Sequence, residues 1–278
     1  MDNTCHHDED REILNHLPRC SQLRRKFLIN DVCRLYNVTS SEVGSADYWR
    51  LLVNKHVSLI YCSIPKAGCT TLKSLVRYPE MSKDRVAIFR KSIIRNNLDK
   101  YQKLLLVRHP FSRLYSAYYD KILLSHLTYP QFYLDIAEKY FPGSTTGGTL
   151  NLTFEQFAKL VAYEYKTGAF VNRHWMTQYE LCRPCQIRYD YVAKLETMDI
   201  DEPAIRAMTK VYGPIQKINS HANASDPKNL WAAYRNVGND VIERLLQIYE
   251  ADFRLFGYNC GSVYKSSHSA RQGLIHSG

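Results

Sequence analysis

Residues 56–73, HVSLIYCSIPKAGCTTLK, decide which fold this chain adopts. The apolar run at 57–64 is typical of a buried strand, and the pattern at 71–78 predicts a helix. A strand, a loop and a helix in this order aim several backbone N–H groups at one spot, which favours an anion. We expect the loop to bind a phosphate-bearing group through Pro65, Lys66, Ala67, Gly68, Cys69, Thr70 and Thr71.

This loop differs from the common nucleotide phosphate loop. In GxxxxGK[ST] the lysine follows the last glycine, whereas Lys66 precedes the single glycine here. Lys66 would add a mobile positive charge, and Thr70 and Thr71 would add hydroxyl donors. The alternative is an ordinary connection between a strand and a helix, in which Pro and Gly only shape a turn.

A second segment carries basic and hydroxyl side chains after another strand. The apolar run at 103–107 is typical of a strand buried on both faces of a parallel sheet, and Pro110 suits the first turn of a helix. Arg108 lies at the carboxyl edge of that strand, where ligands of open α/β sheets bind, and would hold a second phosphate. Ser116, two helical turns further on, could donate from the same side. Arg113 would join this site or pair with an acidic residue, and the alternative for the whole segment is a helix start with a surface arginine.

Strands and helices alternate along the rest of the chain. Further strands are predicted at 85–89 and 188–195, a flexible loop at 141–149, and one long helix ending before Gly257. Thr153 and Gln156 form a capping box before another helix. This order predicts an α/β fold of the P-loop-like, three-layer kind, with a central mainly parallel sheet flanked by helices. The expected boundaries are a flexible arm at 1–20, one domain at 21–262, which includes a helical and irregular stretch at 21–56, and a flexible tail at 263–278.

Charge and composition narrow the class of partner. The 37 basic residues exceed the 27 acidic ones by 10, which favours anionic partners. No motif of a nucleic-acid-binding protein occurs, so no nucleic acid is expected. No run approaches 18 apolar residues and the N-terminus is polar and acidic, so neither a membrane segment nor a signal peptide is predicted in this chain. Three Asn-X-Ser/Thr sequons, at Asn37, Asn151 and Asn223, favour a secretory compartment.

The chain contains eight cysteines, and two of them form a CxxC pair, Cys182 and Cys185. This pair could be redox-active, form half of a zinc site with His174, or be structural. Its connectivity cannot be deduced from spacing alone. Cys69, inside the phosphate-binding loop, is expected to be a small loop residue and not a nucleophile.

The two phosphate-binding segments together resemble those of sulfotransferases that use 3′-phosphoadenosine 5′-phosphosulfate (PAPS). Further segments are similar to the carbohydrate sulfotransferases of the HNK-1, chondroitin and dermatan 4-O-sulfotransferase group, and the resemblance covers roughly residues 20–260. These segments are Arg173–Trp175, Leu181–Cys185, Tyr189–Glu196, Tyr249–Phe253 and Phe256–Tyr258.

The resemblance implies an enzyme that transfers a sulfonate from PAPS to a sugar hydroxyl of a glycosaminoglycan or glycoprotein glycan, with a chondroitin- or dermatan-type acidic acceptor favoured. Lys66 would stabilise charge on the leaving phosphate, and Arg108 and Ser116 would hold the 3′-phosphate. No metal is required. Among His109, His126, His174 and His221, His174 is the expected general base, with Trp175 shaping or stacking on a sugar ring. His109 would pack near the nucleotide.

The resemblance also implies a Golgi lumen location and a disulfide role for the CxxC pair, with Cys33 and Cys260 among the candidate partners. Two features depart from the family. This sequence contains no N-terminal membrane anchor, so either the protein has none or the sequence lacks the part that carries it. Leu72 also stands where many relatives carry tryptophan. Two other hypotheses stay open. One is a P-loop-type small-molecule kinase, although GK[ST] and a magnesium carboxylate are missing; the other is a non-catalytic glycan-binding relative.

Overall fold

The computed structural model describes residues 18–37, 50–76, 97–124, 128–168, 171–215 and 222–259. The chain divides into two compact units. Unit 1 comprises Met1–Arg108, Gln178–Asn219 and Arg254–Gly257, and unit 2 comprises His109–Thr177, Ser220–Phe253 and Tyr258–Gly278. Each unit is described below by itself.

Unit 1 is built on a four-stranded sheet. Its strands are β1 (Leu51–Asn54), β2 (Leu59–Cys62), β3 (Gln102–Val107) and β6 (Tyr191–Lys194), in the order β1-β2-β3-β6. The pairs β2–β3 and β3–β6 are parallel, while β1 is antiparallel to β2. The predicted α/β fold with a mainly parallel sheet is therefore confirmed. The expectation of helical or irregular structure throughout 21–56 is wrong at β1, because this edge strand is too short to show a clear alternating pattern.

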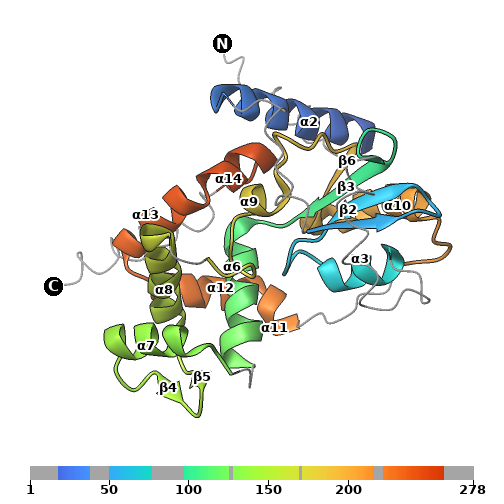
Figure 1. Cartoon of the computed structure of the whole chain (residues 1–278). Helices are drawn as coiled ribbons and strands as arrows, with labels where there is room; N and C mark the ends of the chain where they lie inside the picture. Colours follow the sequence, from blue (N-terminus) through green and yellow to red (C-terminus); the bar gives the residue numbers. More distant parts are fainter. Residues whose placement is uncertain are drawn as a thin grey trace. The chain divides into compact units, whose positions relative to one another are not determined.

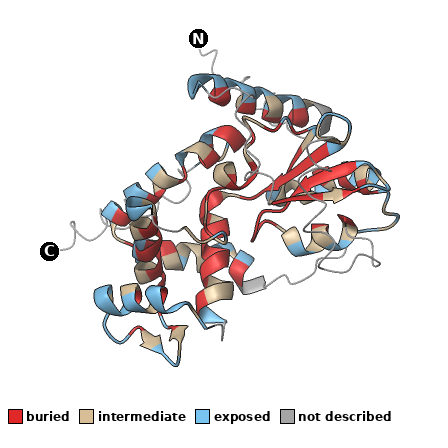
Figure 2. Cartoon of the chain, viewed as in Figure 1, coloured by how far each residue is buried: buried red, intermediate tan, exposed pale blue. Residues whose placement is uncertain are grey.

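Helices cover both faces of this sheet (Figures 1 and 2). One face packs Tyr61, Leu104 and Leu106 against α3 (Cys69–Val76) and α10 (Met198–Thr209). Side chains alternate along a strand, so Cys62 and Val192 point to the other face. That face is covered by α2 (Pro18–Leu35) and α9 (Gln178–Cys182), whose side chains bond to Val192 and Cys62.

Two disulfides fasten α2 and α9 to this unit. They join Cys33 to Cys185 and Cys62 to Cys182. Each cysteine of the CxxC pair therefore has a separate partner, which rules out a redox-active CxxC disulfide and a zinc half-site in this state. The expected partner Cys33 is confirmed, Cys62 was not anticipated, and Cys260 lies outside the described residues.

Unit 2 is helical. It contains α6 (Pro110–Tyr118) with a π-helical turn η3 (Tyr119–Leu123), α7 (Gln131–Tyr140), α8 (Phe154–Thr167), α11 (Ala222–Ser225), α12 (Pro227–Arg235) and α13 (Asn239–Ile248). The core between them is rich in aromatic rings. Its largest fully buried side chains are Phe111, Phe157, Trp175 and Tyr249.

Several predicted details of the helices can now be compared with the structure. The capping box of α8 is present, with Thr153 accepting from the Gln156 N–H and Gln156 accepting from the Thr153 N–H. The predicted last helix is wrong as one element, because α13 ends at Ile248 and α14 (Glu250–Phe256) follows; Gly257, with φ 59°, ends α14 as expected. Loop 141–149 holds a short hairpin of β4 (Thr145–Thr146) and β5 (Thr149–Leu150).

Three sequence predictions fall on residues that the structure does not describe: most of the arm at 1–20, the strand at 85–89 and the tail at 263–278.

In unit 1 the turn η4 (Leu195–Thr197) joins β6 to α10. Across the described ranges, no helix has the length and apolar character needed to cross a membrane.

Candidate active site

The predicted phosphate-binding loop lies between β2 and α3. Lys66 and Gly68 both have left-handed backbone conformations, with φ values of 67° and 71°. Left-handed residues in a turn curl successive N–H groups toward one side, which makes a concave site for an anion. A Cβ atom at Gly68 would lie 3.2 Å from the side chains of both Leu106 and Leu195, so the loop packs closely on β3 and η4, and a side chain there would have to displace these leucines.

Arg108 joins the second predicted segment to this loop. Its guanidinium Nη1 donates to the Lys66 carbonyl at 3.1 Å. Its backbone is held on both sides by Gln178, whose Oε1 accepts from the Arg108 N–H at 2.9 Å and whose Nε2 donates to the Arg108 carbonyl at 2.8 Å. Gln178 is fully buried in α9 and carries no motif signal, so sequence analysis missed it. Arg108 and the loop therefore meet within unit 1.

Two further cations lie at the same edge of the sheet. Arg50 precedes β1, and its guanidinium donates to the Ser63 carbonyl at the base of the loop, at 2.8 Å from Nε. Lys194 ends β6 in register with Val107, the residue before Arg108. With Lys66 and Arg108, each strand of the sheet has one cation at this edge, which makes it favourable for a polyanion. Arg50 belongs to no motif and Lys194 was noted only as part of the Tyr189–Glu196 segment, so only the strand register assigns them to this edge.

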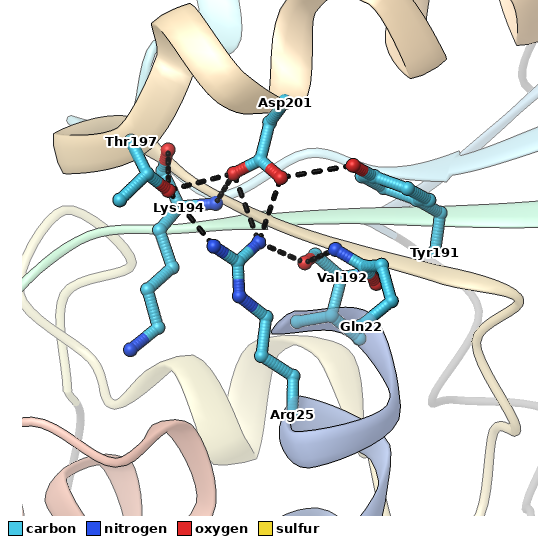
Figure 3. A network of polar contacts seen from close by, with 7 residues as sticks. All are labelled: Gln22, Arg25, Tyr191, Val192, Lys194, Thr197 and Asp201. Carbon is cyan, nitrogen blue, oxygen red and sulfur yellow. Dashed lines mark hydrogen bonds and ion pairs between the residues drawn. The ribbon is translucent and has the colours of Figure 1, made fainter. Parts of the chain in front are cut away.

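A buried polar network supports the end of β6 (Figure 3). The Arg25 guanidinium faces the Asp201 carboxylate, with Nη1 2.8 Å from Oδ1, and the same nitrogen donates to the Val192 carbonyl. The other Asp201 oxygen accepts from the Lys194 N–H at 2.9 Å. Figure 3 shows the Lys194 side chain leading away from this carboxylate. Burial, together with the nearby Arg25 charge, lowers the pKa of Lys194 to about 8.

Three residues of the second predicted segment lie in unit 2, on or beside α6. The Arg113 side chain is fully buried and donates to the Met176 carbonyl, a backbone group and not the acidic side chain considered as its alternative partner. Ser116 is buried in the second turn of α6. The His109 ring contacts the rings of Phe253 and Tyr258 edge-on.

His174 lies in a tight turn of unit 2 that begins at Asn172. The Asn172 carbonyl accepts from the Trp175 and Met176 N–H groups, and its side-chain Oδ1 accepts from the His174 N–H at 3.0 Å. The same Oδ1 is 2.9 Å from His174 Nδ1. His174 is half-buried, and its contacts with Asn172 hold the ring in place. His126 and His221 lie outside the described residues.

Trp175 is held in the core by Glu164 of α8. Its Nε1–H donates to Glu164 Oε2 at 2.8 Å, and the Tyr249 hydroxyl donates to its carbonyl. Since the Trp175 ring is 0 % exposed, the expectation that it stacks on a sugar is wrong. Burial raises the pKa of Glu164 to about 7, and the donors Trp175 and Asn172 oppose this rise.

The two units thus carry different chemical capacities. Unit 1 offers backbone N–H groups and cations to an anionic group at the carboxyl edge of the sheet. Unit 2 offers an imidazole whose orientation is fixed by hydrogen bonds. Within the described part of the chain, no cluster of His, Cys, Asp or Glu could hold a metal ion.

Comparison with known proteins extends this description. Residues 49–259 match the family described as "Sulfotransferase family". Among curated proteins, carbohydrate sulfotransferase 12 of Mus musculus is 28% identical over 85% of this chain and 68% of its own length. Carbohydrate sulfotransferase 11 of Danio rerio is 28% identical over 87% and 77%, and carbohydrate sulfotransferase 10 of Mus musculus is 28% identical over 85% and 75%. No solved structure matches the chain significantly.

Proposed function

The chain belongs to the sulfotransferase family, and we propose that it is a carbohydrate O-sulfotransferase that uses PAPS as its donor. The acceptor is a sugar hydroxyl of a glycosaminoglycan or glycoprotein glycan. The observation that supports this proposal is the contact of Arg108 with the Lys66 carbonyl, because it brings one basic residue from each of the two candidate segments to one edge of the sheet. A donor with phosphate groups at both ends of its ribose needs two such segments.

The Pro65–Thr71 loop binds the 5′-phosphosulfate of the donor in this proposal. Its backbone N–H groups and the N-terminus of α3 receive the phosphate oxygens, and Lys66 stabilises the charge that develops on the bridging oxygen. Arg108 and Ser116 bind the 3′-phosphate. Arg113 contributes to that segment from inside α6, where it bonds to Met176.

His174 is the general base of the proposed reaction. The acceptor oxygen forms a bond to sulfur while the bond from sulfur to the bridging oxygen breaks, and the electron pair stays on the departing phosphate. The hydroxyl proton moves to the imidazole, which leaves a sulfated sugar and 3′-phosphoadenosine 5′-phosphate (PAP). A positioned histidine suits this transfer near neutral pH.

The acceptor class and compartment follow from charge and from the cysteines. A net charge of +10 favours an acidic chain of the chondroitin or dermatan type. The relatives named carbohydrate sulfotransferase support a glycan acceptor. Two disulfides and three sequons favour the Golgi lumen, because disulfides persist in oxidising compartments.

Isothermal titration with PAP tests the donor site. We expect micromolar binding by the unaltered protein and loss of detectable binding in Arg108→Ala. Because Arg108 is buried, its replacement can also disturb folding. Lys66→Ala is a second variant that is less prone to misfolding, because the Lys66 side chain is only half-buried on the loop. Lys55→Ala is the matched control, because Lys55 is exposed in the turn between β1 and β2, at the opposite edge of the sheet.

Other outcomes would point to the other hypotheses. Binding of ATP with magnesium in place of PAP would indicate a kinase. Binding of chondroitin by folded protein that binds neither nucleotide would indicate a non-catalytic glycan-binding relative. Transfer of radiolabelled sulfonate from PAPS to desulfated chondroitin or dermatan would establish the acceptor class.

A further inference from the structure

The turn that carries His174 has a feature that sets the state of the imidazole. Two groups of His174 contact one oxygen, Asn172 Oδ1: the backbone N–H at 3.0 Å and ring Nδ1 at 2.9 Å. A backbone N–H can only donate, so the side-chain atom of Asn172 that faces it is the amide oxygen. That oxygen can only accept, and ring Nδ1 must therefore carry a proton.

This assignment determines which nitrogen of the neutral ring can act as a base. A neutral imidazole has one protonated and one unprotonated nitrogen, and here the proton is on Nδ1. The lone pair then lies on Nε2. The proposed proton transfer needs such a lone pair, and the hydrogen bond at Nδ1 also stabilises the imidazolium that forms.

The backbone of Asn172 is in turn bonded to a buried acid, Glu164. Glu164 Oε2 accepts from the Asn172 N–H at 3.1 Å and from Trp175 Nε1 at 2.8 Å. One carboxylate oxygen on α8 therefore fixes both ends of the turn that contains His174. Glu164 is only 4% exposed, so its geometry is set by the core and not by solvent.

We infer that Asn172 is a positioning residue for the reaction: it holds His174 with Nδ1 protonated and Nε2 unprotonated, and Glu164 anchors Asn172 to the core. The inference rests on the proposed role of His174 and deepens it. It adds a residue that sequence motifs did not indicate, since Asn172 precedes the Arg173–Trp175 segment and has no partner that is visible in the sequence.

Other titratable and charged groups around this turn must be considered in any pH experiment. Tyr133 of α7 lies beside the Asn172 side chain; burial raises its pKa, Glu164 raises it further and Asn172 opposes the rise. Arg113 of α6 donates to the Met176 carbonyl, and the Tyr165 hydroxyl of α8 accepts from the Thr177 N–H. The others are Tyr249, bonded to the Trp175 carbonyl, the exposed Arg173 and Glu164 itself.

The test compares Asn172→Asp and Asn172→Ala in sulfonate transfer between pH 5 and 9. In Asn172→Asp a carboxylate faces Nδ1 and raises the pKa of the imidazole, so the acid limb of the kcat profile should move up by about one pH unit. In Asn172→Ala the tautomer is no longer fixed, and kcat should fall about tenfold with the KM for PAPS unchanged. Asn236→Asp, the same change at an exposed position after α12, should alter neither.

A second readout does not depend on activity. Nitrogen chemical shifts of the His174 ring, assigned by comparison with His174→Asn, report which nitrogen is protonated. We expect a protonated Nδ1 and an unprotonated Nε2 in the unaltered protein, and a mixture of tautomers in Asn172→Ala. A neutral His174 ring that carries its proton on Nε2 in the unaltered protein would overturn the inference.

His174→Ala separates failure of this inference from failure of the proposed function. If His174→Ala is inactive but neither Asn172 variant changes kcat or its pH profile, Asn172 has no positioning role and the proposed base stands. If His174→Ala retains full activity, the base assignment and the inference both fail. The donor site would still be judged separately, by PAP binding to the unaltered protein.

Discussion

Unit 1 and unit 2 acquire their candidate functional residues by different physical means. In unit 1 the strand order places Arg50, Lys66, Arg108 and Lys194 at one edge, so the backbone topology itself gathers the charges. In unit 2 the position of His174 depends on side chains that reach from α8 and from the turn itself. An anion site can follow from topology, whereas an oriented base needs specific packing around it.

The largest effect should come from the loop of unit 1. Lys66→Ala should lower kcat for sulfonate transfer about 10³-fold, because a preorganised cation facing the leaving group contributes about that factor. The measurement is single-turnover transfer at saturating PAPS. Lys55→Ala should stay within twofold of the unaltered protein. If Lys66→Ala transfers sulfonate at the rate of the unaltered protein, Lys66 has no catalytic role and the contrast between the two units fails.

The disulfides of unit 1 allow the stability of the two units to be compared. Replacing both Cys62 and Cys182 by alanine removes a link between residues 120 apart and should lower the free energy of unfolding by about 4 kcal/mol. Amide hydrogen exchange should become faster in β2 and β3 and change little in α8. Cys20→Ser, which alters a free thiol, serves as the control. Equal acceleration in both units would show that they unfold together.

Unit 2 should show a pH dependence that originates in its buried acid. The folded pKa of Glu164, about 7, lies above its ordinary value of 4.5, so the folded state binds the proton more tightly than the unfolded chain. The corresponding stability is present below pH 4.5 and is lost as the pH rises through 7, amounting to about 3 kcal/mol at 1.36 kcal/mol per pKa unit. Urea unfolding at pH 5, 6, 7 and 8 measures it.

Glu164→Gln should remove this pH dependence, because an amide does not titrate in the range. Glu155→Gln makes the same change at a partly exposed position of the same helix and should leave the pH dependence in place. If the unaltered protein and Glu164→Gln show parallel curves, the buried acid does not titrate near neutrality. The free energy of unfolding would then not depend on the ionisation of Glu164.

The smallest effect concerns the two hydrogen bonds by which Gln178 holds the Arg108 backbone. Gln178→Ala leaves the Arg108 N–H and carbonyl without their buried partners and should weaken PAP binding about tenfold. Gln178→Glu, whose side chain still accepts from the Arg108 N–H, should lose less affinity for PAP. Titration calorimetry measures both, with Gln247→Ala, an exposed position of α13, as the control. Unchanged affinity in Gln178→Ala would mean that the sheet alone positions Arg108.

By itself the sequence determined the elements around the two segments proposed to bind the donor. The runs before Pro65 and Arg108 are apolar and short, so they predict buried parallel strands, and the α/β fold and the positions of the two candidate anion-binding segments follow from local order. Local signals also located the capping box of α8 and the end of α14 at Gly257, because caps and left-handed glycines depend on neighbouring residues only.

Only the tertiary structure decided the partners of single polar residues. Gln178, Arg50, Asn172 and Glu164 have no periodicity or motif, and their roles arise from contacts with residues that the chain brings near them on folding. The pairing of Cys62 with Cys182 and the complete burial of Trp175 belong to the same class. Such contacts depend on the packing of whole elements, which a sequence pattern of short range does not specify.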